Sequence, residues 1–248
     1  MAGIPEKPDR WIWYAARTGR CVPLDPASYP STMFLGKPTP LPAWVCRSPN
    51  GGLHIDHRLG RIDIDAAKAP TAGIEINWTC DFGVRVLSRT WLSEIEDLFD
   101  DSAVSAGDVR RKGRRMENWA TLNQAGAPRL LGSEGWADSC PICGCPFSVL
   151  RGRRFFADPS IRGRPLIVNG QGVFVREDLA LSRNLRRPAG SFKPIVVRFL
   201  ANPPALKPRP PWLPPLASPS PPTETKQAPQ SGWRSVISAI WKASGGGH

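Results

Sequence analysis

Apolar and polar residues alternate along short segments in the first half of the chain. In RWIWY (residues 10–14), Trp11 and Trp13 fall on one face of an extended segment. Residues 53–65 alternate in the same way on both sides of Gly60, which is the pattern of a hairpin. A period of two residues is typical of strands that bury one face. These segments therefore predict antiparallel sheet.

Two further segments share one pattern. IEIN (74–77) leads into GVRVLSRTWLSEIEDLF (83–99), and LIVN (166–169) leads into GVFVREDLALSRNL (172–185). Each reads as a strand, a turn, a second strand that begins Gly-Val-x-Val, and a short helix. The repeat predicts an α+β fold with an antiparallel sheet, a few short helices and two similar small lobes.

A basic segment separates the two predicted lobes. We place the lobes at residues 1–105 and 130–200, joined by a loop at 106–129, within one globular unit of residues 1–200. An exposed, solvated loop is one interpretation of the basic run, and a contact patch for phosphates or acidic side chains is the other. The candidate patch residues are Arg110, Arg111, Lys112, Arg114 and Arg115.

The end of the sequence changes character after residue 200. Ten of the twenty residues from Pro203 to Pro222 are proline. Because proline removes backbone donors and favours extended conformations, we predict a linker at 201–230.

A helical stripe follows the linker, and we predict an amphipathic helix at residues 231–244. Its apolar positions are spaced i, i+3, i+4, i+7 and i+8. A helix this short needs a surface that covers its stripe. Its own domain, a groove on a partner and a membrane surface are the three candidates, and the membrane is the least favoured because the helix carries few basic residues. The stripe consists of Trp233, Val236, Ile237, Ile240 and Trp241.

Composition and charge narrow the class of protein. The chain has 248 residues, of which 41% are hydrophobic, so it can fill a core rather than remain disordered. Its formal net charge of +12 attracts acidic partners, whether nucleic acid, an anionic membrane or an acidic protein. We expect a cytoplasmic protein because neither a signal peptide nor a run of about 20 apolar residues is recognised. In that compartment, cysteines are expected as thiols or metal ligands rather than as structural disulfides.

The clearest candidate chemistry is the cysteine cluster SCPICGCPF (139–147). Cys140 and Cys143 are spaced as in a zinc knuckle, and the glycine that follows favours a tight turn. Structural zinc takes four tetrahedral ligands, so two more must come from elsewhere in the chain. We favour Cys46 and Cys80 among the candidates and expect Cys145 to lie too close to join. The full set of candidates for the other positions is Cys21, Cys46, Cys80, Cys145, His54 and His57.

Other interpretations of these residues remain. The three clustered cysteines are also consistent with packing thiols, and less so with redox chemistry, because the segment predicts a turn that leads into a strand rather than a helix N-terminus. His54 and His57 point to opposite faces of a strand and are a poor pair of ligands. The sequence contains no P-loop and no Gly-x-Ser-x-Gly motif, and it favours a binding protein over an enzyme.

The second half also resembles a known family. CPICG, FADPSIRGRPLIVNGQGVFVREDLALSRNL and the closing FKPIVVRFL are similar to the second half of the double-CxxCG-motif proteins, which are bacterial and best represented in myxobacteria. The resemblance covers about 60 residues, and Cys140, Cys143 and Gly144 match the motif. The family's first CxxCG is missing here. The resemblance implies an immunity-type protein that neutralises a toxin-like protein partner, and the alternative is a nucleic-acid-associated protein that uses residues 110–115.

Overall fold

The computed structural model describes most of the first 203 residues: 9–17, 21–25, 42–47, 53–79, 82–99, 103–128 and 130–203, without the side chains of 135–138 and 146–151. The chain divides into two units, Met1–Ala217 and Ser218–His248, and all described residues belong to the first. Residues 204–230 of the predicted linker and the predicted helix at 231–244 lie outside the described residues.

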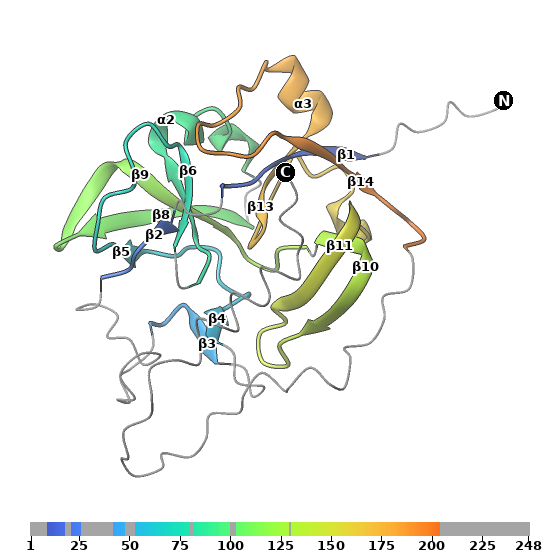
Figure 1. Ribbon diagram of the computed structural model, residues 1–248, viewed down its shortest axis with the longest axis horizontal. Helices are drawn as coiled ribbons and strands as arrows, with labels where there is room; N and C mark the ends of the chain where they lie inside the picture. The colour runs from blue at the N-terminus through green and yellow to red at the C-terminus, as the bar shows by residue number, and fades with distance from the viewer. Residues whose placement is uncertain are drawn as a thin grey trace, which may run out of the picture. The chain divides into compact units, whose positions relative to one another are not determined.

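One six-stranded sheet takes up the middle of the sequence (Figure 1). Its strands are antiparallel to their neighbours except for two parallel pairs, β2 with β6 and β5 with β8. In spatial order the strands are β2 (Cys21–Val22), β6 (Ile76–Thr79), β7 (Arg85–Ser88), β9 (Arg114–Gln124), β8 (Val104–Arg111) and β5 (Ile64–Asp65).

A second six-stranded sheet combines the first described strand with the second half of the chain. Its neighbours are antiparallel except for β11 and β14. In spatial order the strands are β10 (Leu130–Ser139), β11 (Pro146–Phe156), β14 (Ile195–Phe199), β1 (Arg10–Tyr14), β13 (Gly172–Arg176) and β12 (Leu166–Asn169). A separate pair consists of β3 (Val45–Arg47) and β4 (Leu53–Ile55).

The helices among the described residues are short. They are α2 (Arg89–Leu92), α3 (Glu177–Ser182) and two 3-10 turns, η1 (Glu96–Leu98) and η2 (Pro159–Ile161). Ser88 caps α2, because its hydroxyl accepts a hydrogen bond from the N–H of Trp91 at 3.2 Å. Within the described part of the chain, no helix has the length and apolar character needed to cross a membrane. The sheet-rich fold with few short helices confirms the predicted α+β class in its coarse form.

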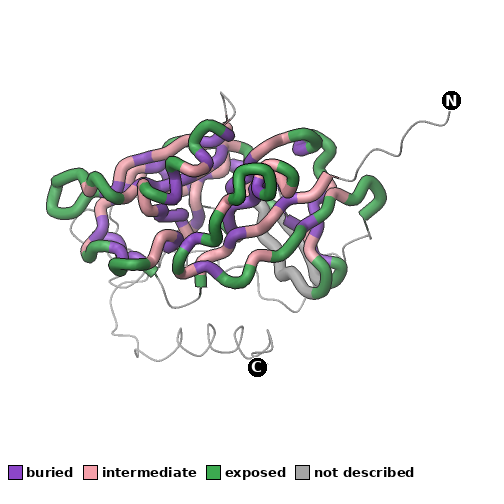
Figure 2. The backbone as a smooth tube through the Cα atoms, turned by 90° about the horizontal axis from the view of Figure 1, so that it is seen from above, coloured by how far each residue is buried: buried purple, intermediate pink, exposed green. Residues whose placement is uncertain are grey.

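The largest core cluster joins the two six-stranded sheets. Ile76 and Leu122 come from the first sheet, and Tyr14 and Val173 come from the second. Trp91 of α2 is fully buried among them, and its ring meets that of Tyr14 edge to face at 5.5 Å. In Figure 2 the buried stretches alternate with exposed turns along the chain, as strands with one covered face require.

The two similar segments form the predicted elements. β6, β7 and α2 follow one another in the first sheet, and β12, β13 and α3 do so in the second. The predicted lobe boundaries differ from the structure in two places. Residues 10–14 pair with β13 and β14, so the second sheet is not built from 130–200 alone. Most of residues 106–129 belong to β8 and β9 rather than to a loop, because Val109, Ala120 and Leu122 are buried in the first sheet.

The expected hairpin around Gly60 is also absent from the described residues. β4 pairs with β3, and β5 pairs with β8. The chain turns after β4 because the Asp56 carboxylate accepts hydrogen bonds from the backbone N–H of Arg58 at 3.0 Å and from its Nε at 2.9 Å. This local pairing ends β4 and separates it from the buried Ile62 and Ile64.

Candidate metal centre

The β3–β4 pair places two potential ligands side by side. Cys46 lies directly opposite His54 in this antiparallel pair. Facing residues in a sheet project to the same side with their Cβ atoms about 5 Å apart. The small sheet therefore presents one thiol and one imidazole from a single face.

The turn between β10 and β11 supplies two more potential ligands, Cys140 and Cys143. The backbone N–H of Gly144 donates to the carbonyl of Cys140 at 2.8 Å, and the N–H of Cys140 donates to the carbonyl of Cys145 at 2.9 Å. Gly144 has φ +74°, a left-handed conformation that side chains disfavour. This tight turn brings Cys140 and Cys143 to the same side, as the CPICG spacing predicts.

The two pairs converge into one cluster. The Sγ atoms of Cys46, Cys140 and Cys143 and a ring nitrogen of His54 all lie within 4.8 Å of one another. The Cys46 and Cys140 sulfurs are 3.9 Å apart, and His54 Nε2 is 3.1 Å from the Cys143 sulfur. Tetrahedral zinc with bonds of about 2.3 Å to sulfur and about 2.05 Å to nitrogen separates two sulfurs by roughly 3.8 Å and a sulfur from a nitrogen by roughly 3.6 Å. The cluster is compatible with a metal site of this size.

The four side chains are shielded from solvent. Cys46, Cys140 and Cys143 are 2–6% exposed, and His54 is 9% exposed. Burial strengthens electrostatic interactions and makes uncompensated thiolates costly. A cation is therefore the group that this arrangement can hold best.

Two of the thiols have pKa values shifted in opposite directions. Burial, followed by the neighbouring Cys143 and Cys140 thiols, raises the pKa of Cys46 to about 12. Burial also raises the pKa of Cys140, but hydrogen bonds from the backbone N–H groups of Cys143 and Ile142 outweigh it and lower the pKa overall. Without a cation the cluster holds at least one proton. A divalent metal supplies the positive charge that deprotonates the remaining thiols.

Arg58 forms an ion pair with Asp56, two residues after His54. Its pKa is raised first by hydrogen bonding to Asp56 and in addition by the negative charge of Cys143 and Cys46. The backbone N–H of Asp56 in turn donates to the carbonyl of Trp44 at 2.8 Å. The Asp56 carboxylate balances the charge of this guanidinium, with Asp56 Oδ2 2.6 Å from Arg58 Nη2.

The structure brings together three of the four predicted metal ligands and adds a fourth. Cys140, Cys143 and Cys46 belong to the cluster, whereas Cys80 lies outside the described residues. Sequence reasoning placed His54 among the candidates but did not favour it, because it was weighed as a partner of His57. The signal that could have found it is the eight-residue spacing from Cys46, which suits a short hairpin.

The other candidate ligands are placed differently. Cys145 is partly buried against the cluster but is not one of its four members. The ring of His57 lies beside the Gly144 turn rather than in the cluster. Cys21 is disulfide-bonded, which removes it from the candidates and departs from the expectation that cysteines are present as thiols.

The remaining predicted site residues lie elsewhere or outside the described chain. The five basic residues of 110–115 surround the β8–β9 turn, in the first sheet. The stripe from Trp233 to Trp241 is outside the described residues. No family model and no curated protein matches this chain.

Proposed function

We propose that this chain is a non-catalytic binding protein stabilised by a structural zinc ion. The single observation that carries the zinc site is the convergence of three sulfurs and one imidazole nitrogen within 4.8 Å. Thiolate and imidazole are the ligands of structural zinc, and four of them complete its tetrahedron. A complete protein ligand set leaves no open position for substrate, which favours a structural role over a catalytic one.

The ion would join elements that are far apart in the sequence. Cys46 and Cys140 are separated by 94 residues, one in β3 and the other at the end of β10. The β3–β4 pair has three facing residue pairs. Two isolated short strands are marginally stable in water. Zinc would hold this pair against the β10–β11 turn.

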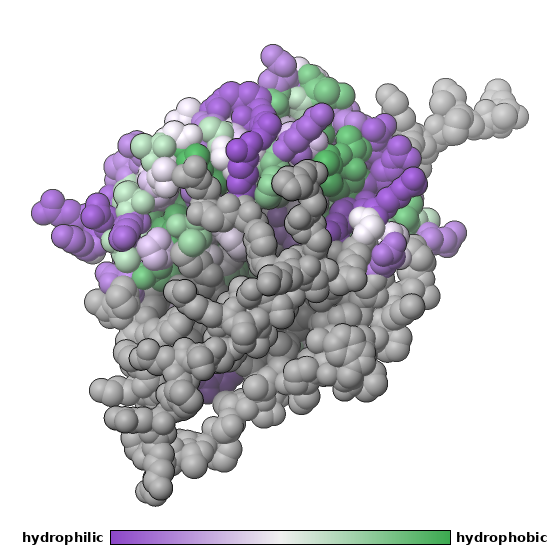
Figure 3. Space-filling model, viewed as in Figure 1, coloured by the Kyte–Doolittle hydropathy of each residue, from purple (hydrophilic) through white to green (hydrophobic). Residues whose placement is uncertain are grey.

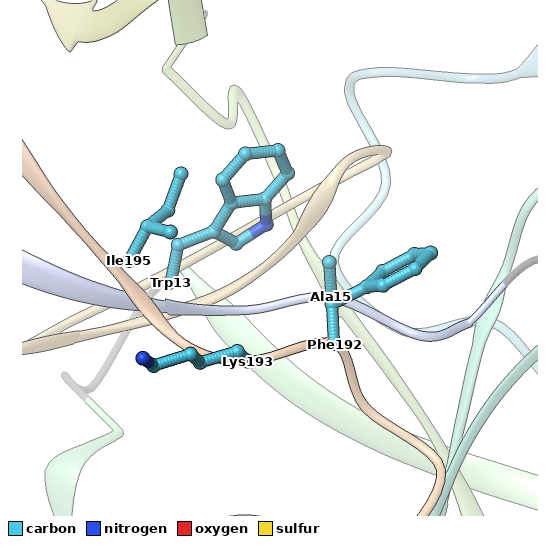
Figure 4. Close-up of a pocket in the computed structure, with 5 residues that line it drawn as sticks. All are labelled: Trp13, Ala15, Phe192, Lys193 and Ile195. Carbon is cyan, nitrogen blue, oxygen red and sulfur yellow. The ribbon is translucent and has the colours of Figure 1, made fainter. Parts of the chain in front are cut away.

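A hydrophobic hollow beside β14 supports the binding role. It is lined by residues of β1 and the position just after it, and by residues at the start of β14 and in the segment that leads into it. Figure 4 shows Trp13 beside Ile195 and Phe192 beside Ala15. Phe192 and Ile195 are 47% and 46% exposed, which is unusual for large apolar side chains. Phe192 is fixed by its backbone N–H, which donates to the carbonyl of Ala15 at 2.9 Å.

The hollow fits a protein partner of defined chemistry. Its apolar wall accepts an inserted hydrophobic side chain, and one exposed basic residue, Lys193, belongs to the wall. Acidic groups around the inserted side chain would complement this charge. We take the partner to be a toxin-like protein, as the resemblance to immunity-type proteins implies.

Metal content tests the zinc part of the proposal. The purified full-length protein should contain about one zinc per chain, and both Cys143→Ser and His54→Ala should lose it. Cys145→Ser is the matched control, because that thiol lies beside the cluster without belonging to it. Equal zinc loss in the Cys145 variant, or no zinc in the parent protein, would contradict the assignment.

Rescue of growth tests the binding part. Cells that express a toxin-like protein encoded beside this chain should survive when the chain is co-expressed, and the two purified proteins should form a complex. Phe192→Ser with Ile195→Ser should abolish both effects. Leu181→Ser, which changes a 68% exposed residue on α3, should preserve them. Absence of complex and rescue with the parent protein would overturn the proposal.

A further inference from the structure

The β8–β9 turn forms the end of a two-stranded ribbon. Lys112 and Gly113 have φ values of 51° and 73°, as the two central residues of a type I′ hairpin require. Arg111 faces Arg114 next to the turn, and Arg110 faces Arg115 one position further back. The ribbon ends at the left of the first sheet in Figure 1, and hydrophilic side chains project from the same place in Figure 3.

Two of these basic residues form ion pairs at the base of the ribbon. The Asp108 carboxylate lies 3.2 Å from Arg115 Nε and 3.9 Å from Arg110 Nη2. It also lies 3.2 Å from Arg61 and 3.9 Å from Arg89, and Arg61 pairs in addition with Asp63 at 3.0 Å. Arg110 and Arg115 therefore belong to an ion-pair network that holds the ribbon to the sheet.

The other three basic residues keep their charge available. Arg111, Lys112 and Arg114 are exposed, and within the described chain no carboxylate lies within ion-pair distance of them. The structure thus divides the basic run into a paired base and an unpaired end. We use the name ribbon tip for Arg111, Lys112, Gly113 and Arg114.

The ribbon tip has charge but no apolar centre. Stable protein interfaces depend on a buried core of aromatic or aliphatic side chains, and attachment to a membrane surface needs apolar residues that insert. Residues 110–115 offer neither. Contacts with nucleic-acid phosphates require only Lys and Arg, and a two-stranded ribbon fits the major groove of duplex DNA. The net charge of +12 adds long-range attraction to the same ligand.

We propose that the ribbon tip binds nucleic-acid phosphates through Arg111, Lys112 and Arg114. Arg110 and Arg115 position the ribbon without contacting the phosphates themselves. Such contacts are independent of base sequence, because they reach only the backbone. This site is separate from the metal centre and from the hydrophobic hollow, so it does not depend on either.

The test compares two triple variants of the full-length protein. The first is Arg111→Gln, Lys112→Asn and Arg114→Gln, in which asparagine suits the positive φ of its position. The control is Arg47→Gln, Lys68→Gln and Arg153→Gln, which removes the same charge from exposed residues outside the ribbon. Binding to a 20-base-pair DNA duplex and to a 20-nucleotide single-stranded RNA is measured by fluorescence anisotropy across a range of NaCl concentrations.

The parent protein should lose affinity steeply as salt rises. The tip variant should bind at least about ten-fold more weakly at 100 mM NaCl, and its log–log salt slope should be shallower by about 2.7 on duplex DNA and about 2.1 on single strands, for three lost phosphate contacts. The control should keep the parent slope to within about one contact. Lys112→Asn alone should reduce the duplex slope by about 0.9. Binding of only one of the two nucleic acids supports the proposal and identifies whether the ribbon tip contacts the phosphates of duplex DNA or of single-stranded RNA.

Several results would overturn it. These are no binding to either nucleic acid at low salt, equal losses in the tip and control variants, or unchanged nucleic-acid binding in a tip variant that loses affinity for polyglutamate. The last result would assign the ribbon tip to an acidic protein instead. Circular dichroism and thermal unfolding of both variants establish that each is folded before binding is compared.

Discussion

Removal of the metal should open the β3–β4 pair without unfolding the rest of the protein. The pair consists of three facing residue pairs, Val45 with Ile55, Cys46 with His54, and Arg47 with Leu53. It is hydrogen-bonded to neither six-stranded sheet. Chelation of zinc removes the bonds that tie it to the β10–β11 turn.

The size of this effect follows from the interactions that still hold the β3–β4 pair once zinc is removed. A net hydrogen bond contributes about 1 kcal/mol, while fixing one backbone unit costs about 1–2 kcal/mol, so the ladder alone does not keep six residues ordered. Packing of the buried Trp44 against Phe82, with ring centroids 5.1 Å apart, opposes opening only in part. We therefore expect the opening free energy of this pair to fall by at least about 2.8 kcal/mol, which is a 100-fold change in exchange rate.

Hydrogen exchange read by mass spectrometry measures this directly. Amides of residues 45–47 and 53–55 should exchange at least about 100-fold faster in the chelated protein, whereas those of β7 and β9 should be unchanged, because the core cluster around Leu87 and Leu122 contains none of the four ligands. Cys143→Ser should reproduce the effect, and Cys145→Ser should not. Equal protection of 45–47 and 53–55 with and without zinc would refute this prediction, as would loss of protection in β7 and β9.

Three further predictions concern the turn, a carboxylate and the core. Gly144→Ala should weaken zinc binding about ten-fold, because a residue with a side chain costs about 1–2 kcal/mol in the left-handed conformation. Gly163→Ala, at φ +76°, is the control and should leave zinc affinity unchanged. Competition with a chromogenic chelator measures zinc affinity in both variants. Hydrogen bonds from Arg186 hold the pKa of Glu75 below 4.5, so its contribution to stability should be complete above pH 4.5 and decline as pH falls through the lower folded value. Urea unfolding from pH 7 to 3 checks this decline, which Glu75→Gln should make shallower. Trp91→Ala should lower the free energy of unfolding by about 3–5 kcal/mol in urea titration, because the side chain is fully buried.

The elements that depend on neighbouring residues were predictable from the sequence. The strand–turn–strand–helix order of 76–92 and 166–182 follows from local alternation and spacing. The turn at 140–145 follows from the CPICG pattern and its glycine, which has φ +74°. These features need no knowledge of distant partners.

Choices between distant partners were not predictable in the same way. The pattern of RWIWY does not indicate that residues 10–14 pair with both β13 and β14. The basic run at 110–115 obscured the strand pattern around it, in which Val109 before the run and Leu122 after it are buried. The fourth ligand was missed for a related reason. His54 and His57 are separated because β4 ends at Ile55 and His57 lies in the following turn, not because they alternate along one strand. The partner of His54 is Cys46 across the ladder, which only strand register reveals.

The most direct test of the metal centre is zinc K-edge X-ray absorption on the purified, full-length protein. We predict that zinc is coordinated by three sulfurs at about 2.3 Å and one nitrogen at about 2.0 Å, from Cys46, Cys140, Cys143 and His54. A shell of four sulfurs, which would place Cys145 at the metal instead of His54, or a shell of oxygen and nitrogen alone, would contradict it.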